Sequence, residues 1–156
     1  MNARRHRRGL SLLELLVVVT LMGVFASTAF MRFGRDIFGD SGARSVTRTV
    51  SLGLLQAQRA AIRTGDRHAL IFQGPLANAI SWTIIQETAG GSQVVISGPH
   101  TVADEVTMSC NQNEMWFDFE GAGSQMFAAD ISGPNRSYEL RVEPLTRMIR
   151  TREVTP

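Results

Sequence analysis

The longest apolar run of the chain lies close to its N-terminus. Residues 10–31 (LSLLELLVVVTLMGVFASTAFM) hold a single charged side chain, Glu14. A helix of this length spans about 33 Å at 1.5 Å per residue, which is enough to cross a hydrocarbon core of about 30 Å. The pattern predicts a transmembrane helix over residues 10–31.

Apolar periodicity returns between Ala43 and Thr64. Small and branched residues recur there at three- and four-residue steps and form one stripe: Val46, Val50, Leu54, Ala57 and Ala61. This spacing predicts an amphipathic helix that ends at Gly65. The intervening segment Arg32–Gly42 contains three glycines, each unfavourable in a helix by about 1 kcal/mol. Residues 32–64 are therefore expected to be a linker and an amphipathic helix, and the glycine-rich part is either a flexible portion of one long helix or a true break.

Beyond Gly65 the pattern changes to short segments separated by turn signals such as Gly74-Pro75, Gly98-Pro99 and Gly133-Pro134. The predicted strands are 67–73, 81–87, 93–97, 105–110, 115–119, 126–131, 137–143 and 148–152. Their number and spacing indicate an antiparallel β domain over residues 65–156. With the amphipathic helix packed on that domain, the predicted fold class is α+β.

Charge is distributed unevenly along the chain. The formal net charge is +2, and all 16 basic residues are arginine. Four of them, Arg4, Arg5, Arg7 and Arg8, precede the apolar run with no acid beside them. The positive-inside rule then places the N-terminus in the cytoplasm and the residues after the span outside it.

Three interpretations compete for this N-terminal region. It is a secretory signal peptide cleaved after Ala29, a twin-arginine signal based on Arg7-Arg8, or a permanent anchor. Glu14 favours the anchor, because a carboxylate inside an apolar span costs a few kcal/mol and needs a partner. An export signal has no need for that acid. The alternative for Glu14 itself is that it snorkels to the edge of the membrane.

The segment Gly9-Leu10-Ser11-Leu12-Leu13-Glu14 resembles the class III signal of type IV pilins and type II secretion pseudopilins. The resemblance implies a leader of residues 1–9 that a prepilin peptidase removes between Gly9 and Leu10. It also implies N-methylation of Leu10, and pairing of Glu14 with the N-terminal amine of an adjacent subunit during assembly. Leu10 departs from the pattern, since the family usually has Phe there.

Later segments extend the resemblance to the GspH/FimT group: residues 54–72, 116–125 and 140–154. The resemblance implies a pilin-like minor pseudopilin of the type II secretion system. Such a subunit is held in the inner membrane by a single pass, with its C-terminal domain in the periplasm. The implied partners are other major and minor pseudopilins, the prepilin peptidase, the inner-membrane secretion platform and membrane lipid.

The alternative within this group is a type IV pilus minor pilin of the FimT kind, which binds DNA through a basic C-terminal patch during natural transformation. The corresponding residues here are Arg147, Arg150 and Arg152. Arginines of this kind engage phosphates and give salt-sensitive binding. Thr146 replaces the Gly that opens the family's patch, and Glu143 and Glu153 dilute its charge, so an Arg cluster that pairs with a neighbouring subunit is favoured.

No arrangement typical of an enzyme or a metal site stands out. His6, His68 and His100 are far apart in the sequence, and the single Cys110 excludes an internal disulfide. Asp118 and Glu120 alternate as on one face of a strand and are expected to face solvent. Cys110 is expected to be a half-buried small apolar residue rather than a reactive thiol. The sequence predicts a protein that is not an enzyme and that holds no cofactor and no metal.

Cleavage after Gly9 would change the charge of the protein. The mature chain would keep 12 Arg against 14 acids, a net charge of −2. Without the span and Glu14, the part from Arg32 onward has 12 Arg against 13 acids, a net charge of −1. The basic character of the whole sequence is therefore a signal for topology and processing, and any affinity for nucleic acid must come from local Arg clusters.

Overall fold

The computed structural model describes residues 11–88 and 90–154, without the side chains of residues 32–39. The chain divides into two compact units, with the boundary between Arg35 and Asp36. One helix, α1 (Leu12–Thr64), contributes residues to both units. Its backbone is helical throughout residues 32–42, so the predicted alternative of a break in this segment is wrong. The glycines there lower helix propensity, but propensity is a weak bias that neighbouring helical turns override.

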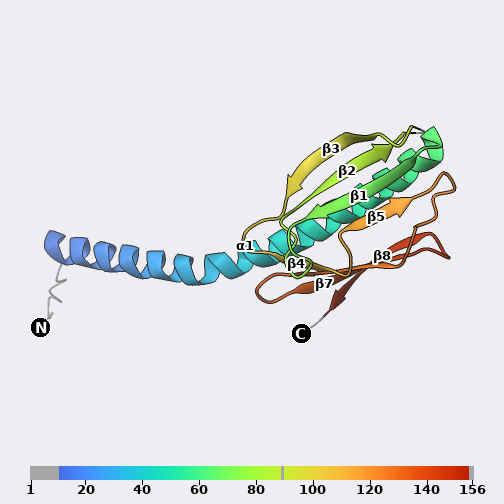
Figure 1. Ribbon diagram of the computed structural model, residues 1–156. Helices are drawn as coiled ribbons and strands as arrows, with labels where there is room; N and C mark the ends of the chain where they lie inside the picture. The colour runs from blue at the N-terminus through green and yellow to red at the C-terminus, as the bar shows by residue number, and fades with distance from the viewer. Residues whose placement is uncertain (1–10, 89, 155–156) are drawn as a thin grey trace, which may run out of the picture. The chain divides into compact units, whose positions relative to one another are not determined.

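The second unit contains two antiparallel four-stranded sheets within the described residues (Figure 1). The first sheet has the order β3-β2-β1-β5 and consists of β1 (Arg67–Gln73), β2 (Ser81–Glu87), β3 (Gln93–Thr101) and β5 (Glu114–Phe117). The second has the order β4-β6-β7-β8 and consists of β4 (Thr107–Cys110), β6 (Phe127–Ser132), β7 (Ser137–Glu143) and β8 (Met148–Val154). The predicted α+β fold class is confirmed.

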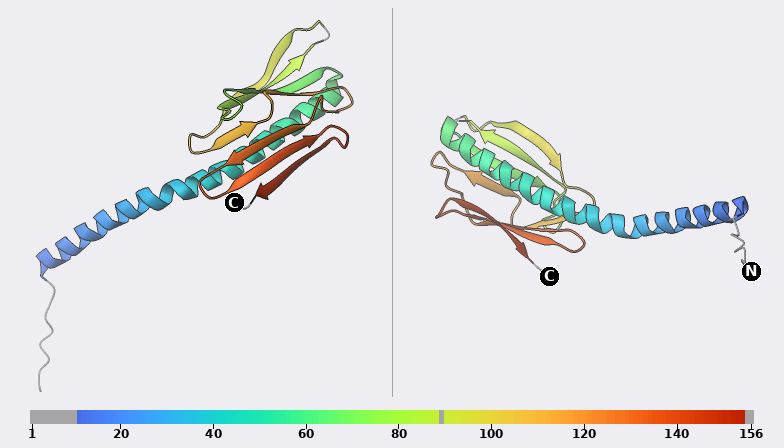
Figure 2. Two further views of the ribbon diagram at one scale, coloured as in Figure 1. Left: turned by 60° about the horizontal axis from the view of Figure 1, so that its bottom comes forward. Right: turned by 180° about the vertical axis from the view of Figure 1, so that it is seen from behind.

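The C-terminal part of α1 lies along both sheets and supplies one side of their common core (Figure 2). The predicted apolar stripe is buried at every position: Val46, Val50, Leu54, Ala57 and Ala61. Its residues join one cluster with side chains from both sheets, and the rings of Phe72 on β1 and Phe127 on β6 stack with centroids 5.1 Å apart. Neither sheet therefore has a complete core without the helix.

Gly53 permits a close approach between α1 and the first sheet. A Cβ atom at this position would lie 2.8 Å from Cζ3 of the buried Trp82 side chain on β2. Any residue other than glycine would therefore move either the indole or the helix. In the sequence, Gly53 is only a residue of low helix propensity within a helical pattern. In the structure, its missing side chain makes room for the Trp82 ring.

Asp40 of α1 fixes the turn between β6 and β7. Its Oδ1 accepts hydrogen bonds from the backbone N–H groups of Asn135 (2.8 Å) and Arg136 (3.1 Å), and its Oδ2 accepts one from the Asn135 side-chain amide. These bonds, led by the backbone N–H of Asn135, hold the pKa of Asp40 below its ordinary value of 3.8. The carboxylate thus ties a helix to a turn 95 residues later in the chain.

The strand boundaries agree closely with the sequence patterns, and the differences are informative. Strands β1, β2 and β7 have the predicted limits, whereas β3 extends to Thr101 and β8 to Val154. Strand β4 begins at Thr107 rather than residue 105, and β6 is displaced by one residue. Strand β5 ends at Phe117 instead of residue 119, because Asp118 begins a turn. Phe119, the last residue of the predicted strand 115–119, is 62% exposed in that turn.

Candidate functional site

The predicted cleavage and methylation site, Gly9 and Leu10, lies outside the described residues. Glu14 is described and lies in the first turn of α1, where a carboxylate is favoured by the helix dipole. Its side chain is exposed and has no ion-pair partner among the described residues of this single chain. The position is thus open to a group from outside the chain.

The apolar segment that contains Glu14 has the length and composition of a membrane span. Residues Leu12–Met31 form a 20-residue stretch with a mean hydropathy of 2.1, and none of it is buried within the protein. The hydroxyl groups of Ser27 and Thr28 are satisfied within the helix: the Ser27 hydroxyl donates to the Gly23 carbonyl at 2.9 Å, and the Thr28 hydroxyl to the Val24 carbonyl at 2.9 Å. Such bonds remove much of the cost of placing hydroxyl groups in lipid.

Arg147, the first of the three predicted C-terminal arginines, has a local structural role. It lies in the turn between β7 and β8 with φ near 56°, and its guanidinium forms an ion pair of 2.9 Å with Glu120. Its backbone carbonyl accepts a hydrogen bond from the Gln58 side chain. These contacts anchor the turn and partly neutralise the cation.

Arg150 and Arg152 lie on alternate positions of β8 and share one face of the second sheet. They are opposite Arg141 and Glu139, respectively, on β7. Arg141 in turn forms an ion pair with Glu139. The structure therefore places Arg150 and Arg152 in one exposed patch that also contains Glu139. Arg147 lies apart from them and pairs with Glu120.

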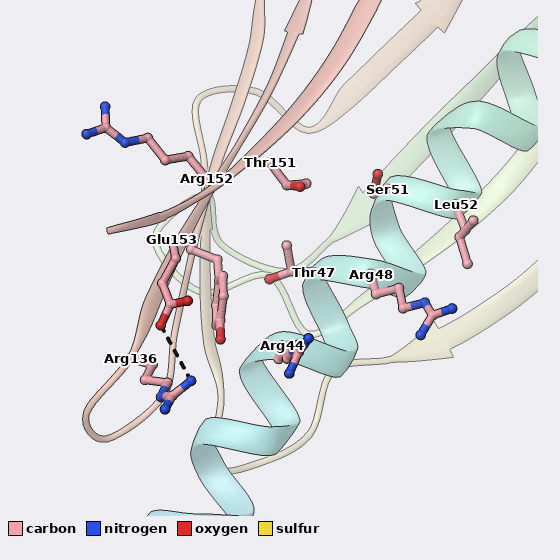
Figure 3. Close-up of a pocket in the computed structure, with 10 residues that line it drawn as sticks. Arg44, Thr47, Arg48, Ser51, Leu52, Arg136, Thr151, Arg152 and Glu153 are labelled. Carbon is pink, nitrogen blue, oxygen red and sulfur yellow. Dashed lines mark ion pairs between the residues drawn. The ribbon is translucent and has the colours of Figure 1, made fainter. Parts of the chain in front are cut away.

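A hollow of about 560 Å³ separates α1 from β8 (Figure 3). Arginines approach it from three elements: Arg44 and Arg48 from α1, Arg136 from the β6–β7 turn, and Arg152 from β8. Arg136 is bridged to Glu153 at 3.6 Å, and the guanidinium of Arg152 is directed away from α1 (Figure 3). Arg44 and Arg48 of α1 thus line this hollow without an ion-pair partner among the described residues.

The exposed face of α1 carries a surface that the sequence interpretation did not assign. Four arginines lie there, Arg44, Arg48, Arg59 and Arg63, and none forms an ion pair with a described residue. Arg59 and Arg63 border a second hollow of about 570 Å³, which lies between α1 and Ile96 of β3. The signal in the sequence was the presence of four Arg and no acid between Ala43 and Thr64.

The remaining candidate residues, His68, His100 and Cys110, pack against or hydrogen-bond to neighbouring parts of the fold. His68 is a buried strand residue whose Nδ1 lies 3.1 Å from the Asp66 carbonyl, and exposed His100 packs against the Trp82 ring at 4.2 Å. Cys110 is buried on β4, and desolvation, with a smaller effect of nearby Asp130, raises its pKa to about 12. The described part of the chain contains no group of three or more potential metal ligands.

Asp118 and Glu120, the two acids expected on one strand face, lie in the turn after β5 instead. Asp118 Oδ1 accepts backbone N–H bonds from Glu120 at 3.0 Å and Ala122 at 2.8 Å. Glu120 pairs with Arg147. The expected placement of both acids on a strand is therefore wrong, because β5 ends before them, whereas Glu120 faces solvent as expected.

A family model described as the prokaryotic N-terminal methylation motif matches residues 4–30, which include Gly9, Leu10 and Glu14. The β domain and helix have the fold of solved pilins. The chain thus combines the N-terminal methylation motif with a pilin-like fold. The predicted resemblance is thereby confirmed at the level of the motif and the fold. The comparison with curated proteins gives no match.

Two solved structures illustrate the likeness of this pilin-like chain. The type IV minor pilin FimU of Pseudomonas aeruginosa PAO1 matches with a TM-score of 0.61 and 12% identity, over 74% of this chain and 92% of FimU. The minor pseudopilin EpsH from the type 2 secretion system of Vibrio cholerae matches with a TM-score of 0.57 and 14% identity, over 73% of this chain and 97% of EpsH. At such identities the likeness concerns the fold.

Proposed function

We propose that the chain is a minor pseudopilin of a type II secretion system. It would be made as a prepilin, cleaved between Gly9 and Leu10, methylated on Leu10, and added to a periplasmic fibre that moves folded proteins outward. The observation that carries this proposal is the methylation motif over residues 4–30, which includes most of an exposed apolar helical segment, in a chain with a pilin-like fold. The protein would act mechanically, as a subunit rather than as an enzyme.

The proposed location is the inner membrane, with the N-terminus in the cytoplasm and residues 32–156 in the periplasm. The cluster Arg4, Arg5, Arg7 and Arg8 before the span supports this orientation. Its partners would be major and minor pseudopilins, the prepilin peptidase and the secretion platform. Glu14 would neutralise the amine of an adjacent subunit, because in lipid an unpaired charge of either sign is costly.

The processing step is tested by co-expression of the full chain with a prepilin peptidase, followed by mass measurement of its N-terminus. We expect a methylated product that begins at Leu10. A Gly9→Val variant should stay uncleaved, since a branched side chain obstructs the close approach of the protease, while Gly23→Ala should be cleaved normally. A product that begins at Phe30 or still at Met1 would contradict the proposal.

The role in secretion is tested by deleting the gene in its own host. Loss of folded secreted proteins from the medium, restored by the intact chain, is the expected result. Normal secretion together with a loss of pilus-dependent DNA uptake would instead favour the second candidate function.

That second candidate is a type IV pilus minor pilin that captures DNA. The observation in its favour is the exposed face shared by Arg150 and Arg152. Binding of duplex DNA to the detergent-solubilised full chain should then weaken steeply with salt, and Arg150→Gln with Arg152→Gln should reduce the logarithmic salt slope by about 1.8. Replacement of Arg67, which is paired with Glu87 on the first sheet, should leave the slope nearly unchanged. No binding at low salt excludes this candidate.

A further inference from the structure

Each sheet has two edge strands, and three of the four edges are protected against further pairing. The edge strands are β3 and β5 in the first sheet and β4 and β8 in the second. Strand β4 already has a partner on its outer side, since the Ala79 N–H donates to the Met108 carbonyl at 2.7 Å. Strand β5 has four residues, and its Trp116 carbonyl accepts a bond from the Ser124 N–H at 2.9 Å. Strand β3 contains Pro99 and two register shifts against β2, features that blunt an edge.

The fourth edge, β8, is regular and open. Strand β8 pairs with β7 without a register shift, from Met148 opposite Glu143 to Val154 opposite Ser137. On its other side, its backbone forms no hydrogen bond with any residue that the structure describes. In an antiparallel strand, alternate residues direct both N–H and C=O away from the paired neighbour. The outer edge of β8 therefore presents a row of free donors and acceptors at the spacing that one more strand requires.

Two arginines give this edge a positive charge on the face that is turned away from α1. Arg150 and Arg152 are exposed there, and neither forms an ion pair with a described residue. Glu139 lies opposite Arg152 on β7 but pairs with Arg141 instead. A strand added beside β8 would bring two of its alternate side chains to about 4.5–5.5 Å, between Cβ atoms, from these arginines. Carboxylates at those two positions would be favourable, whereas cations would be repelled.

The opposite face of β8 borders the hollow of about 560 Å³ beside α1. Thr151 and Glu153 of β8 line this hollow, and Glu153 is bridged to Arg136 at 3.6 Å. Arg44 and Arg48 line it from α1 (Figure 3). The hollow leaves room for the side chains that an added strand would direct to this face. Its cations favour acidic or polar side chains there as well.

We infer that the outer edge of β8 binds an extended acidic segment of another polypeptide as a fifth strand of the second sheet. Carboxylates at alternate positions of this segment would face Arg150 and Arg152. The β8 strand of a second copy fits poorly, because antiparallel pairing would set arginine against arginine. Duplex DNA offers phosphates to the arginines but no backbone groups that would continue a strand ladder. The inference goes beyond the proposed function and does not depend on it.

The test uses the detergent-solubilised full chain and a fluorescein-labelled peptide of four Val-Glu repeats, which as a strand has one acidic face. Fluorescence anisotropy should show saturable binding that weakens with salt. The same peptide with a methyl group on every backbone nitrogen keeps its carboxylates but cannot donate to a ladder, and it should not bind. Absence of binding by the unmodified peptide at low salt, or equal binding by the methylated one, would overturn the inference.

The role of the arginines is tested with the double variant Arg150→Gln/Arg152→Gln. We expect its affinity for the Val-Glu peptide to fall about fivefold, as the loss of two exposed ion pairs predicts. The matched control is Arg59→Gln/Arg63→Gln, which removes the same charge from exposed residues that do not line the hollow beside β8. This control should bind like the unchanged chain. Equal affinities for the two double variants, with unchanged thermal midpoints by tryptophan fluorescence, would refute the inference.

The binding position is tested with a photoreactive residue at the centre of the Val-Glu peptide. Illumination should label Met148–Val154, whereas labelling confined to β3 would overturn the inference. An unlabelled DNA duplex is the competitor. If it displaces the peptide and the methylated peptide binds equally well, the surface is a general polyanion site and strand addition is refuted. None of these assays requires cleavage or a fibre, so their failure leaves the proposed function to its own test of the N-terminal mass.

Discussion

The side-chain amide of Gln58 on α1 donates a hydrogen bond of 2.8 Å to the backbone carbonyl of Gly121. The same Nε2 donates to the carbonyl of Arg147 at 3.2 Å. One buried side chain therefore joins the helix to the turn after β5 and to the turn before β8. Gly121 has φ near 75°, and a Cβ there would lie 2.7 Å from Ile62 Cδ1 of the helix, so the turn is shaped to approach α1 closely.

Replacement of Gln58 by Leu should lower the free energy of unfolding by about 1–3 kcal/mol, because two carbonyl groups lose a buried partner. Both Trp residues of the chain are in the β domain, so tryptophan fluorescence of the detergent-solubilised full chain reports its thermal unfolding. Gln56→Leu on the exposed face of the same helix is the control and should change the midpoint little. Equal midpoints for both variants would show that the bonds from Gln58 contribute nothing.

Gly53→Ala should also destabilise the domain, by about 1–3 kcal/mol, although alanine is the better helix former by about 1 kcal/mol. The added methyl would overlap the Trp82 ring and force the core to shift. The matched variant is Gly23→Ala on the same helix, where a new Cβ meets nothing within 4 Å. Stabilisation by Gly53→Ala, measured by the same fluorescence assay, would disprove the close contact.

Cys110 should resist alkylation in the folded protein and react once the chain is unfolded in urea. Burial raises the pKa of the thiol to about 12, so the nucleophilic thiolate is scarce at pH 8. Between pH 9 and about 12 the unfolded chain releases the thiol proton while the folded chain keeps it. The free energy of unfolding therefore falls as the pH rises through this range. Rapid modification of the native protein at pH 8 would contradict the buried position.

Glu14→Leu should leave processing intact and prevent entry into the fibre. The substitution removes the only acid of the apolar span but leaves Gly9 and Leu10 in place. We expect N-terminal mass spectrometry to show a normal product and isolated fibres to lack the chain. Leu16→Ala in the same exposed segment is the control and should still assemble. Normal assembly of Glu14→Leu would favour the alternative that this acid merely snorkels to the membrane surface.

The sequence predicted the local elements well, because hydrophobic spacing depends on burial and burial follows the period of a helix or a strand. The stripe from Val46 to Ala61 and strands such as Arg67–Gln73 are examples. The assignment of strands to two sheets was not predicted. It depends on contacts between distant residues, such as the stacking of Phe72 on Phe127, which leave no periodic signal.

The candidate sites were predicted less completely. The methylation motif was readable because its spacing is local, from Gly9 to Glu14. The grouping of Arg147 with Arg150 relied on closeness in the sequence, whereas the structure pairs Arg147 with Glu120, 27 positions away. The hollow beside Leu52 also escaped prediction, since it exists only where β3 passes the helix.

Asp40 and the buried stripe have a mechanical consequence. Both connect α1 to the β domain at successive points along the helix axis, from the turn at Asn135 to the core around Ala61. A pull along that axis would load these contacts in parallel, so that many must fail together, instead of peeling apart one after another. The domain should therefore yield at a higher force when pulled along α1 than when the edge strand β8 is pulled away from β7, where the ladder opens pair by pair.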